Sequence, residues 1–191
     1  MGRPVCGADP RTARSAVNFE PTPIAGAIIV KTELVEDERG GVGRSFCQDE
    51  FRAQGLTPPV AQSSVSWNRR RGTLRGMHYQ AKPHEEVKLV RCTRGAVWDV
   101  IVDLRGNSPT RLHWHGLELN SENRLALYIP EGVAHGFQTL CDDSEVLYQM
   151  SVPYFAGLAR GVLWNDPAVG VDWPIANPIL SERDRSHPPL P

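Results

Sequence analysis

The strongest constraint on the fold of this chain is a series of short apolar runs, each closed by Gly, Pro, Asn or Asp. From Ile28 onward the runs are IIVKTEL, QSSVSW, VKLVRC, AVWDVIVDL, LHWHGLEL, LALYIP, AHGFQTL, EVLYQM and GVLW. Strands at this spacing are typical of antiparallel sandwiches and barrels. Helix is scarce, because the candidates are limited to Gln48 to Gln54 and a turn near Ser121 to Arg124. The sequence therefore predicts an all-β antiparallel fold with few short helices.

The strand pattern also divides the chain. A length of 191 residues indicates one domain. Residues 1–24 are rich in Arg, Ala and Pro and lack periodicity, so we expect a flexible leader there. Residues 25–176 carry the strands of the predicted domain. Residues 177–191 form a C-terminal tail, whose composition alone would suggest a frayed end.

Charge and cysteine content exclude several classes of protein. Lys and Arg total 21 against 22 for Asp and Glu, so no net field attracts nucleic acid or an anionic membrane. No apolar run approaches the roughly 18 residues of a membrane span, and none follows the N-terminal arginines as in a signal peptide. The four cysteines are scattered without a C-x-x-C pair. We expect a cytoplasmic protein with no nucleic-acid or membrane partner.

The segment GTLRGMHYQAKPHEEVK, from Gly72 to Lys88, concentrates polar chemistry in one strand, loop and strand. Arg75 and His78 are three residues apart, so on a regular strand they point to opposite faces. Gly76 lies between them and permits a bulge that would turn both side chains to one face. We interpret the segment as the wall of an active site. A plain hairpin with a solvated Arg, His and Lys is the alternative.

The run from Ala96 to Leu104 indicates where a cavity could lie. One face of this strand is wholly apolar, whereas the other mixes valine and isoleucine with Asp99 and Asp103. An interior used only for packing would exclude a carboxylate. Asp99 therefore faces either water or a polar cavity, and we favour the cavity.

The histidines raise the question of a metal centre. His113 and His115 form an H-x-H on one face of a strand, but apolar residues continue that face and no carboxylate lies at a matching offset. His78 with Glu85 and His135 is the other conceivable set. We predict no metal at either place. We also predict no cofactor, because the sequence has no Walker loop, G-x-G-x-x-G or G-x-S-x-G motif.

Acid–base chemistry remains, and its components are present. His78 has the one side-chain type that acts as a base at neutral pH without strong tuning. Lys88 can stabilise a developing oxyanion, and Arg75 can bind a phosphate through two hydrogen bonds. Tyr148 can deliver a proton from the other side of a pocket. This set suits removal of a proton next to a carbonyl and its return, although Tyr148 considered alone is more typical of a core aromatic.

A set of motifs occurs in order between about residue 28 and residue 184. They are GTLRGMHYQ (72–80), VKLVR (87–91), Asp99, DLR (103–105), SPT (108–110), IPEGVAHGF (129–137), LY (147–148), LWNDP (163–167), DWP (172–174) and LSERD (180–184). Together they resemble the dTDP-4-dehydrorhamnose 3,5-epimerase family. The resemblance implies a cupin-like antiparallel jelly-roll barrel, usually a homodimer, that acts on a nucleotide-linked 4-keto-6-deoxyhexose without metal or cofactor.

The resemblance also implies roles for individual residues. His78 matches the catalytic base and Asp184 the carboxylate that orients it, so we expect the tail to fold back on the barrel as far as about Asp184. Lys88 matches a lysine near the C4 oxygen, Tyr148 the proton donor, and Arg75 a diphosphate contact. The implied reaction inverts C3 and C5 of dTDP-4-dehydro-6-deoxy-D-glucose through an enolate and gives dTDP-4-dehydro-L-rhamnose. Further substrate-binding positions are Gln62, Ser66, Asp99, His135 and Arg39.

Three departures from the family pattern concern the specificity of the pocket. After DERG at 37–40 the family usually continues with aromatic residues and a Glu, whereas this chain has GVGR at 41–44. Aromatic stacking on a base is worth about 1–3 kcal/mol. Ser64 replaces an Asn in the Q-x-N-x-S pattern, and Gln149 and Met150 follow Tyr148 where a Lys is common. The nucleotide, or the choice between C3 and C5, is therefore open.

Two groups of alternatives follow. Within enzymes, the chain could invert a single carbon or act on another nucleotide, such as CDP. From different classes, it could be a binding cupin without turnover or a metal-dependent cupin oxygenase. The set formed by His78, Lys88, Tyr148 and Asp184 argues against lost activity, because a sugar binder needs no acid and base on opposite faces.

Overall fold

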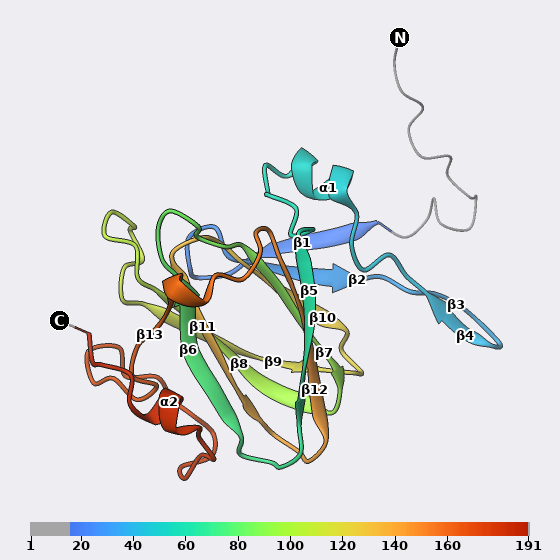
Figure 1. Ribbon diagram of the computed structural model, residues 1–191. Coiled ribbons are helices and arrows are strands. Elements are labelled where there is room, and N and C mark those ends of the chain that lie inside the picture. The colour runs from blue at the N-terminus through green and yellow to red at the C-terminus, as the bar shows by residue number, and fades with distance from the viewer. Residues whose placement is uncertain (1–15, 191) are drawn as a thin grey trace.

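Two antiparallel β-sheets face each other in the computed structural model, which describes residues 16–190 (Figure 1). The larger sheet has six strands in the order β1-β2-β10-β7-β12-β5, and the smaller has five in the order β13-β6-β11-β8-β9. All neighbouring strands in both sheets run antiparallel. This arrangement confirms the predicted all-β jelly-roll class.

The strands follow the apolar runs of the sequence closely. The six-stranded sheet contains β1 (Val17–Pro21), β2 (Ile28–Thr32), β5 (Gln62–Asn68), β7 (Lys88–Arg94), β10 (Leu125–Ile129) and β12 (Ser144–Met150). The five-stranded sheet contains β6 (Leu74–Gln80), β8 (Ala96–Asp103), β9 (Trp114–Asn120), β11 (Val133–Thr139) and β13 (Ala159–Gly161). A separate hairpin consists of β3 (Val35–Asp37) and β4 (Gly40–Val42) and projects from the body (Figure 1).

Within residues 16–190 helical structure is limited to three short pieces. They are α1 (Gln48–Ala53), a 3-10 turn (Ala156–Leu158) and α2 (Glu182–Arg185). The helix expected over Gln48 to Gln54 is confirmed as α1. No helix within residues 16–190 is long and apolar enough to cross a membrane.

The main core lies between the two sheets, where the inward faces of their strands meet. Alternate residues of each strand point inward, as the two-residue period of a strand requires. Val90, Leu127 and Val146 from the larger sheet pack against Val97 and Ile101 from the smaller. The inward face of β8 is thus the one that also carries Asp99.

A second cluster covers part of the outer face of the six-stranded sheet. Phe51 of α1 is completely buried, and its ring centroid lies 5.1 Å from that of Phe19 and 6.0 Å from that of Tyr128. Helix α1 therefore shields β1, β2, β10 and β7. The outer face over β12 and β5 is different, because Val65 and Trp67 are exposed there.

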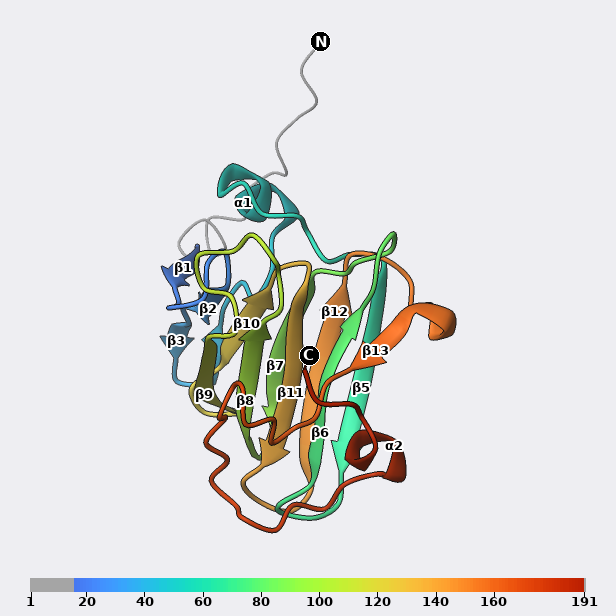
Figure 2. The same ribbon diagram turned by 90° about the vertical axis from the view of Figure 1, so that its left-hand side faces the viewer.

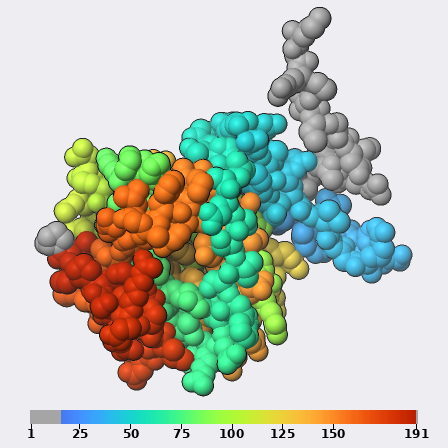
Figure 3. Space-filling model, viewed as in Figure 1, coloured from blue at the N-terminus to red at the C-terminus, as the bar shows by residue number. Residues whose placement is uncertain are grey.

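The outer face of the five-stranded sheet is covered by the C-terminal segment. Met77, Val100 and Val102 pack there with Val171 and Trp173. Figure 2 shows this segment running across the sheet, and Figure 3 shows it in red against the body. Two hydrogen bonds tie this segment to the strands, which are Leu74 N to Ile179 O (2.9 Å) and Gln138 Nε2 to Ile175 O (2.9 Å). A third, from Leu190 N to Asp166 Oδ2 (2.5 Å), holds the end of the segment against the loop after β13.

The structure corrects the predicted leader of residues 1–24. Residues 17–21 form β1, and the side chains of Val17 and Ile24 are buried. The Pro-rich composition concealed this strand because Pro21 and Pro23 lie at its end, where an edge strand tolerates proline. Residues 1–15 lie outside the described part of the chain.

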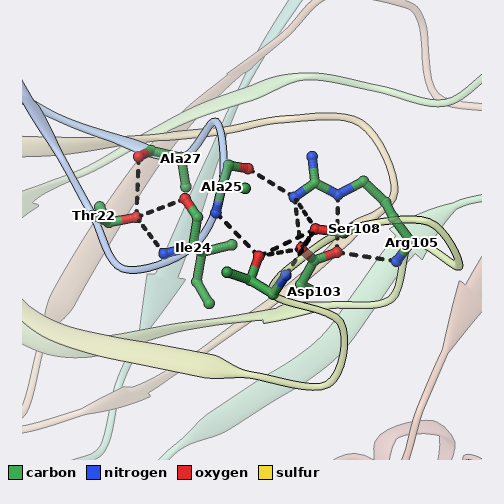
Figure 4. Close-up of polar contacts among 8 residues, drawn as sticks. Thr22, Ile24, Ala25, Ala27, Asp103, Arg105 and Ser108 are labelled. Atoms are coloured by element: carbon green, nitrogen blue, oxygen red, sulfur yellow. Dashed lines mark hydrogen bonds and ion pairs between the residues drawn. The ribbon is translucent and has the colours of Figure 1, made fainter.

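Several of the ordered motifs belong to a polar brace at one end of the barrel (Figure 4). The Asp103 carboxylate accepts hydrogen bonds from Arg105 Nε at 2.8 Å and from Thr110 Oγ1 at 2.7 Å, and Ser108 also donates to it. Arg105 Nη2 and Thr110 Oγ1 in turn bond the backbone of Ala25 at 2.7 and 3.1 Å. This brace fixes the loop before β2, so the DLR and SPT motifs serve the fold.

Candidate active site

A cavity of about 460 Å³ opens between the two sheets. Both sheets and the tail contribute to its wall. From the five-stranded sheet come Arg75, His78, His135, Phe137 and Arg160; from the six-stranded sheet come Ser66, Lys88 and Tyr148; the tail adds Arg183. Residues that are far apart in the sequence thus meet around one space.

Gly76 allows Arg75 and His78 to share the cavity wall. His78 pairs with His135 on β11 and Arg75 pairs with Phe137, so two residues of β6 lie opposite one residue of β11 between these pairs. This register shift is the bulge that the sequence predicted. Gly76 has a φ of +143°, and a Cβ there would lie 2.6 Å from Gly136 Cα. Only glycine fits this position without strain.

His78 forms the closest polar contact of the site with Asp184, at 2.6 Å between Nε2 and Oδ1. The Asp184 side chain is 6% exposed, whereas His78 is 37% exposed toward the cavity. Burial acts to raise the pKa of Asp184, but the hydrogen bonds from His78 and Ser181 outweigh it and hold that pKa below its ordinary value. The carboxylate is therefore ionised and only accepts, so His78 Nε2 carries a proton and Nδ1 is left to act as a base.

Local structure holds Asp184 in place. It lies in α2, and its backbone N–H donates to Ser181 Oγ at 3.1 Å, so Ser181 caps the helix. The serine of the LSERD motif therefore fixes the turn from which the carboxylate reaches His78. The C-terminal segment does fold back on the barrel at this point.

Lys88 and Tyr148 form the opposite wall. In the pairing of β7 with β12, Val90 lies opposite Tyr148 and Lys88 lies opposite Met150. Lys88 and Tyr148 are thus diagonal neighbours on the inward face. Lys88 Nζ lies 2.8 Å from Glu86 Oε1, and both side chains are largely buried. A cation and a phenol therefore face the imidazole across the cavity.

His135 and Asp99 form a second histidine–carboxylate pair, at 2.8 Å between Nε2 and Oδ2. His135 lines the cavity, and Asp99 is completely buried behind it. Asp99 faces the interior, as the alternation of β8 indicated. It does not reach the cavity surface, so its contact with a bound ligand would pass through His135.

Three guanidinium groups surround the cavity. Arg75 Nε donates to Asn68 Oδ1 at 2.7 Å, and Arg160 and Arg183 also line the wall. Sequence reasoning missed Arg160, Arg183 and the cavity residue Tyr154. Arg183 directly precedes Asp184 in LSERD, which is a signal that could have found it. Arg160 lies in the three-residue strand β13 and Tyr154 in the loop before it, and neither has such a signal. Three cations around one opening suit an anionic ligand.

Two predicted substrate-binding residues lie elsewhere in the single chain. Gln62 is at the start of β5, where its Oε1 accepts a hydrogen bond from Tyr154 N at 3.0 Å. Arg39 is in the β3–β4 hairpin, where its side chain is 82% exposed and pairs with Asp37. Neither lines the cavity, whereas the third polar candidate, Ser66, does.

The histidine sets that the sequence suggested for a metal are not assembled. His113 precedes β9, so it does not share a strand face with His115. Among residues 16–190 the trio with ligand atoms close together is His78, Asp184 and His187, within 4.8 Å of one another. Two of these three already share the hydrogen bond described above. The buried thiol of Cys92 is unsuited to nucleophilic chemistry, because burial raises its pKa to about 11.

Comparisons with known proteins agree with this geometry. The family model described as dTDP-4-dehydrorhamnose 3,5-epimerase matches residues 21–191. An enzyme of that name from Sinorhizobium fredii is 40% identical over 173 residues, 90% of this chain and 89% of the relative.

Solved structures of two epimerases also resemble this chain in fold and sequence. A dTDP-4-dehydrorhamnose 3,5-epimerase from Bacillus anthracis, with TDP and PPi bound, has a TM-score of 0.88 and 38% identity over 92% of this chain and 100% of that one. A 3'-monoepimerase from Streptomyces bikiniensis, in complex with dTDP-quinovose, has a TM-score of 0.82 and 35% identity over 88% and 86%.

Proposed function

Because the chain belongs to the dTDP-4-dehydrorhamnose 3,5-epimerase family, we propose that its cavity inverts C3 and C5 of dTDP-4-dehydro-6-deoxy-D-glucose to give dTDP-4-dehydro-L-rhamnose. The chain is an isomerase by family. One observation carries the assignment of residues. The oriented imidazole of His78 and the phenol of Tyr148 stand on opposite sheets around one cavity.

The first step removes a proton next to the C4 ketone. His78 Nδ1 takes the proton from C3 or C5, and the electron pair of that C–H bond forms a carbon–carbon double bond to C4. The C4 oxygen becomes an enolate, which the Lys88 ammonium stabilises. Asp184 stabilises the imidazolium that forms on His78.

The second step returns a proton to the opposite face. The Tyr148 hydroxyl donates its proton to the carbon, the double bond reverts to the C4 ketone, and that carbon is inverted. His78 then releases its proton to water and Tyr148 regains one, so the pair is ready for the second carbon. Inversion follows because the base and the acid belong to different sheets.

The diphosphate has a matching region of charge. We assign it to Arg75, Arg160 and Arg183, since guanidinium groups bind phosphate oxygens through paired hydrogen bonds. The Bacillus anthracis relative was solved with TDP and PPi bound, which supports a thymidine nucleotide here. This chain has glycines at positions 41 and 43, where the family usually has aromatic residues that stack on the base. CDP is therefore the competing nucleotide.

We also propose that the protein works as a homodimer in the cytoplasm. The support is the outer face of the six-stranded sheet, where α1 leaves β12 and the edge strand β5 uncovered. Val65 and Trp67 are exposed on that face, Trp67 by 49%, and Leu147 lies opposite Val65 on β12. An exposed apolar face beside an edge strand is typical of a subunit interface. Cys47, Cys92 and Cys141 are free thiols, which suits a reducing compartment.

Deuterium exchange tests the proposed reaction. The protein is incubated in D2O with dTDP-4-dehydro-6-deoxy-D-glucose, and the C3 and C5 protons are followed by NMR. We expect both signals to disappear as the product forms. Exchange at a single carbon would replace double epimerisation by the single-carbon alternative, which the 35% identity to a 3'-monoepimerase keeps in view. A thermal-shift series with dTDP, CDP, UDP and GDP ranks the nucleotides, because a tight ligand raises the apparent stability.

A further inference from the structure

His187 lies directly beside the His78–Asp184 pair, although nothing in the reaction uses it. Its Nε2 is 3.6 Å from Asp184 Oδ1, and its ring meets that of His78 edge to face, with centroids 5.5 Å apart and planes at 80°. The His187 side chain is 11% exposed. One histidine therefore lies on the cavity side of Asp184, and a second is buried next to both members of the pair.

The second histidine does not share the hydrogen bond. A separation of 3.6 Å is too long for one, and the buried Nε2 of His187 has no hydrogen-bond partner among the described residues. Burial lowers the pKa of His187, and the positive charges of His78 and Arg183 lower it further against the opposing effect of Asp184. Burial and the neighbouring positive charges therefore favour the neutral form of the His187 ring.

Strand β13 is shaped to admit this ring. Gly161 pairs with His78 across β13 and β6, and a Cβ at position 161 would lie 2.3 Å from His187 Nε2. The ring of His187 occupies the space that any other side chain at Gly161 would fill. Strand β13 and the tail thus enclose the outer side of the pair together.

We propose that His187 is a positioning residue, a neutral ring that excludes water from Asp184 so that the carboxylate interacts with His78 alone. Water at Asp184 would solvate the carboxylate and weaken its stabilisation of the imidazolium. A cation at position 187 would compete with His78 for the same charge. The neutral ring avoids both effects because it fills the space without offering a charge. This inference rests on the proposed function of His78 as the base.

Other charged groups face the pair and stay constant in the test. Arg183 comes from α2, and the cavity wall contributes Arg75, Arg160, His135 and Lys88. Variants at positions 187 and 161 change none of them. A difference in pH dependence between the variants would therefore report the environment of the His78–Asp184 pair.

The experiment compares four variants in the full-length protein. H187A opens the space to water, H187L fills it with a neutral side chain, and H187K places a cation there. G161A displaces the ring without changing residue 187. G157A is the matched control, because a Cβ at Gly157 would have no atom within 4 Å. Each protein is measured for kcat and KM across pH and for the deshielded proton resonance of the His78–Asp184 hydrogen bond.

H187A and G161A are expected to lower kcat by about tenfold, a fraction of the roughly 10²–10⁴-fold that a general base contributes. KM should change little. The acidic limb of the kcat profile should move to lower pH, since the imidazolium is less stabilised, and the deshielded resonance should be lost. H187K should move the limb in the same direction. H187L and G157A should keep the wild-type profile and the resonance.

Two results would overturn the inference. One is a wild-type kcat, pH profile and resonance in H187A. The other is an H187L protein as defective as H187A, which would mean that the nitrogen of His187 is needed rather than its bulk. Failure of the proposed function is a separate result, because the wild-type protein would then show no exchange at C3 or C5. The proton resonance reports the His78–Asp184 pair even without substrate.

Discussion

His78 and Asp184 are separated by 106 residues in the chain and by 2.6 Å between Nε2 and Oδ1. The carboxylate is almost completely buried, and the cavity side of the imidazole is open. In the proposed mechanism the two sheets supply the base and the acid, and the tail supplies the carboxylate that orients the base. The proposed activity therefore depends on a segment that lies outside the strand pattern.

Replacing Asp184 by Asn should disable the base without unfolding the protein. An amide can donate to Nε2 and so favour the wrong tautomer of His78, and it carries no charge to stabilise the imidazolium. We expect kcat to fall by about 10²–10⁴-fold with little change in KM. The control is E182Q, an exposed position in the same helix. A D184N enzyme with wild-type turnover would remove Asp184 from the mechanism.

Removing the Tyr148 hydroxyl should separate proton removal from inversion. In Y148F the base remains, so solvent deuterium should still enter the substrate slowly from the His78 side, while the inverted product falls by about 10²-fold or more. NMR in D2O distinguishes exchange with retention from inversion. Y79F is the matched control, since Tyr79 packs under the tail on the other face of β6. Equal rates of inversion in Y148F and the wild type would contradict the assignment.

A side chain at position 76 should damage both the fold and the site. The positive φ and the 2.6 Å approach to Gly136 mean that G76A must shift β6 away from β11. We expect the free energy of unfolding to fall by roughly 2–4 kcal/mol, measured by denaturant titration. Gly106 has open space for a Cβ, so G106A should be neutral by comparison. A G76A protein with unchanged stability and kcat would show that the bulge is unnecessary.

The Asp103 brace predicts a specific dependence of stability on pH. Burial acts to raise the pKa of Asp103, but hydrogen bonds from Arg105, Ser108 and Thr110 together hold it well below its ordinary value. The stabilisation is therefore complete above about pH 4 and is lost as the pH falls through the lower folded-state pKa. D103N should lose roughly 2–4 kcal/mol at pH 7 and less at lower pH.

Thermal unfolding of D103N and wild type between pH 7 and pH 3 measures this difference. The control is D37N, which alters an exposed ion pair on the β3–β4 hairpin and should leave the unfolding temperature unchanged. A difference between wild type and D103N that grows on acidification would contradict the sign of the shift.

Chelation tests whether the reaction needs a metal. In the proposed mechanism Lys88 stabilises the enolate and His78 removes the proton, so neither step requires an ion. We expect dialysis against EDTA to leave kcat unchanged. Loss of turnover that is restored by added Zn²⁺ or Fe²⁺ would instead assign His78, Asp184 and His187 as ligands, since their ligand atoms lie within 4.8 Å of one another.

Local patterns in the sequence predicted most of the barrel. Turn residues at regular intervals marked the strands, and the alternation of β8 placed Asp99 inside, because the two-residue period is a local property. The bulge at Gly76 could be predicted for the same reason. The leader was predicted too long, because amino-acid composition alone does not distinguish a proline-rich coil from an edge strand that ends in proline.

Contacts that depend on the path of irregular segments could not be predicted in the same way. Asp184 was placed by family resemblance, since nothing in residues 177–191 indicates where that segment turns. Arg160 and Tyr154 reach the cavity from the three-residue strand β13 and the loop before it, which are too short to show a periodic pattern. Gln62 and Arg39 were expected at the substrate, yet in one chain Gln62 supports Tyr154 and Arg39 lies on the projecting hairpin.

The position of Asp184 has a consequence for the synthesis of the protein. A ribosome releases His78 long before the helix that carries its partner, so every strand of the barrel is complete while the imidazole still lacks its carboxylate. A nascent chain, or a product of premature termination before residue 184, would possess the cavity, the lysine and the phenol but no directed base. In the proposed mechanism, efficient epimerisation would begin only after Asp184 has been translated.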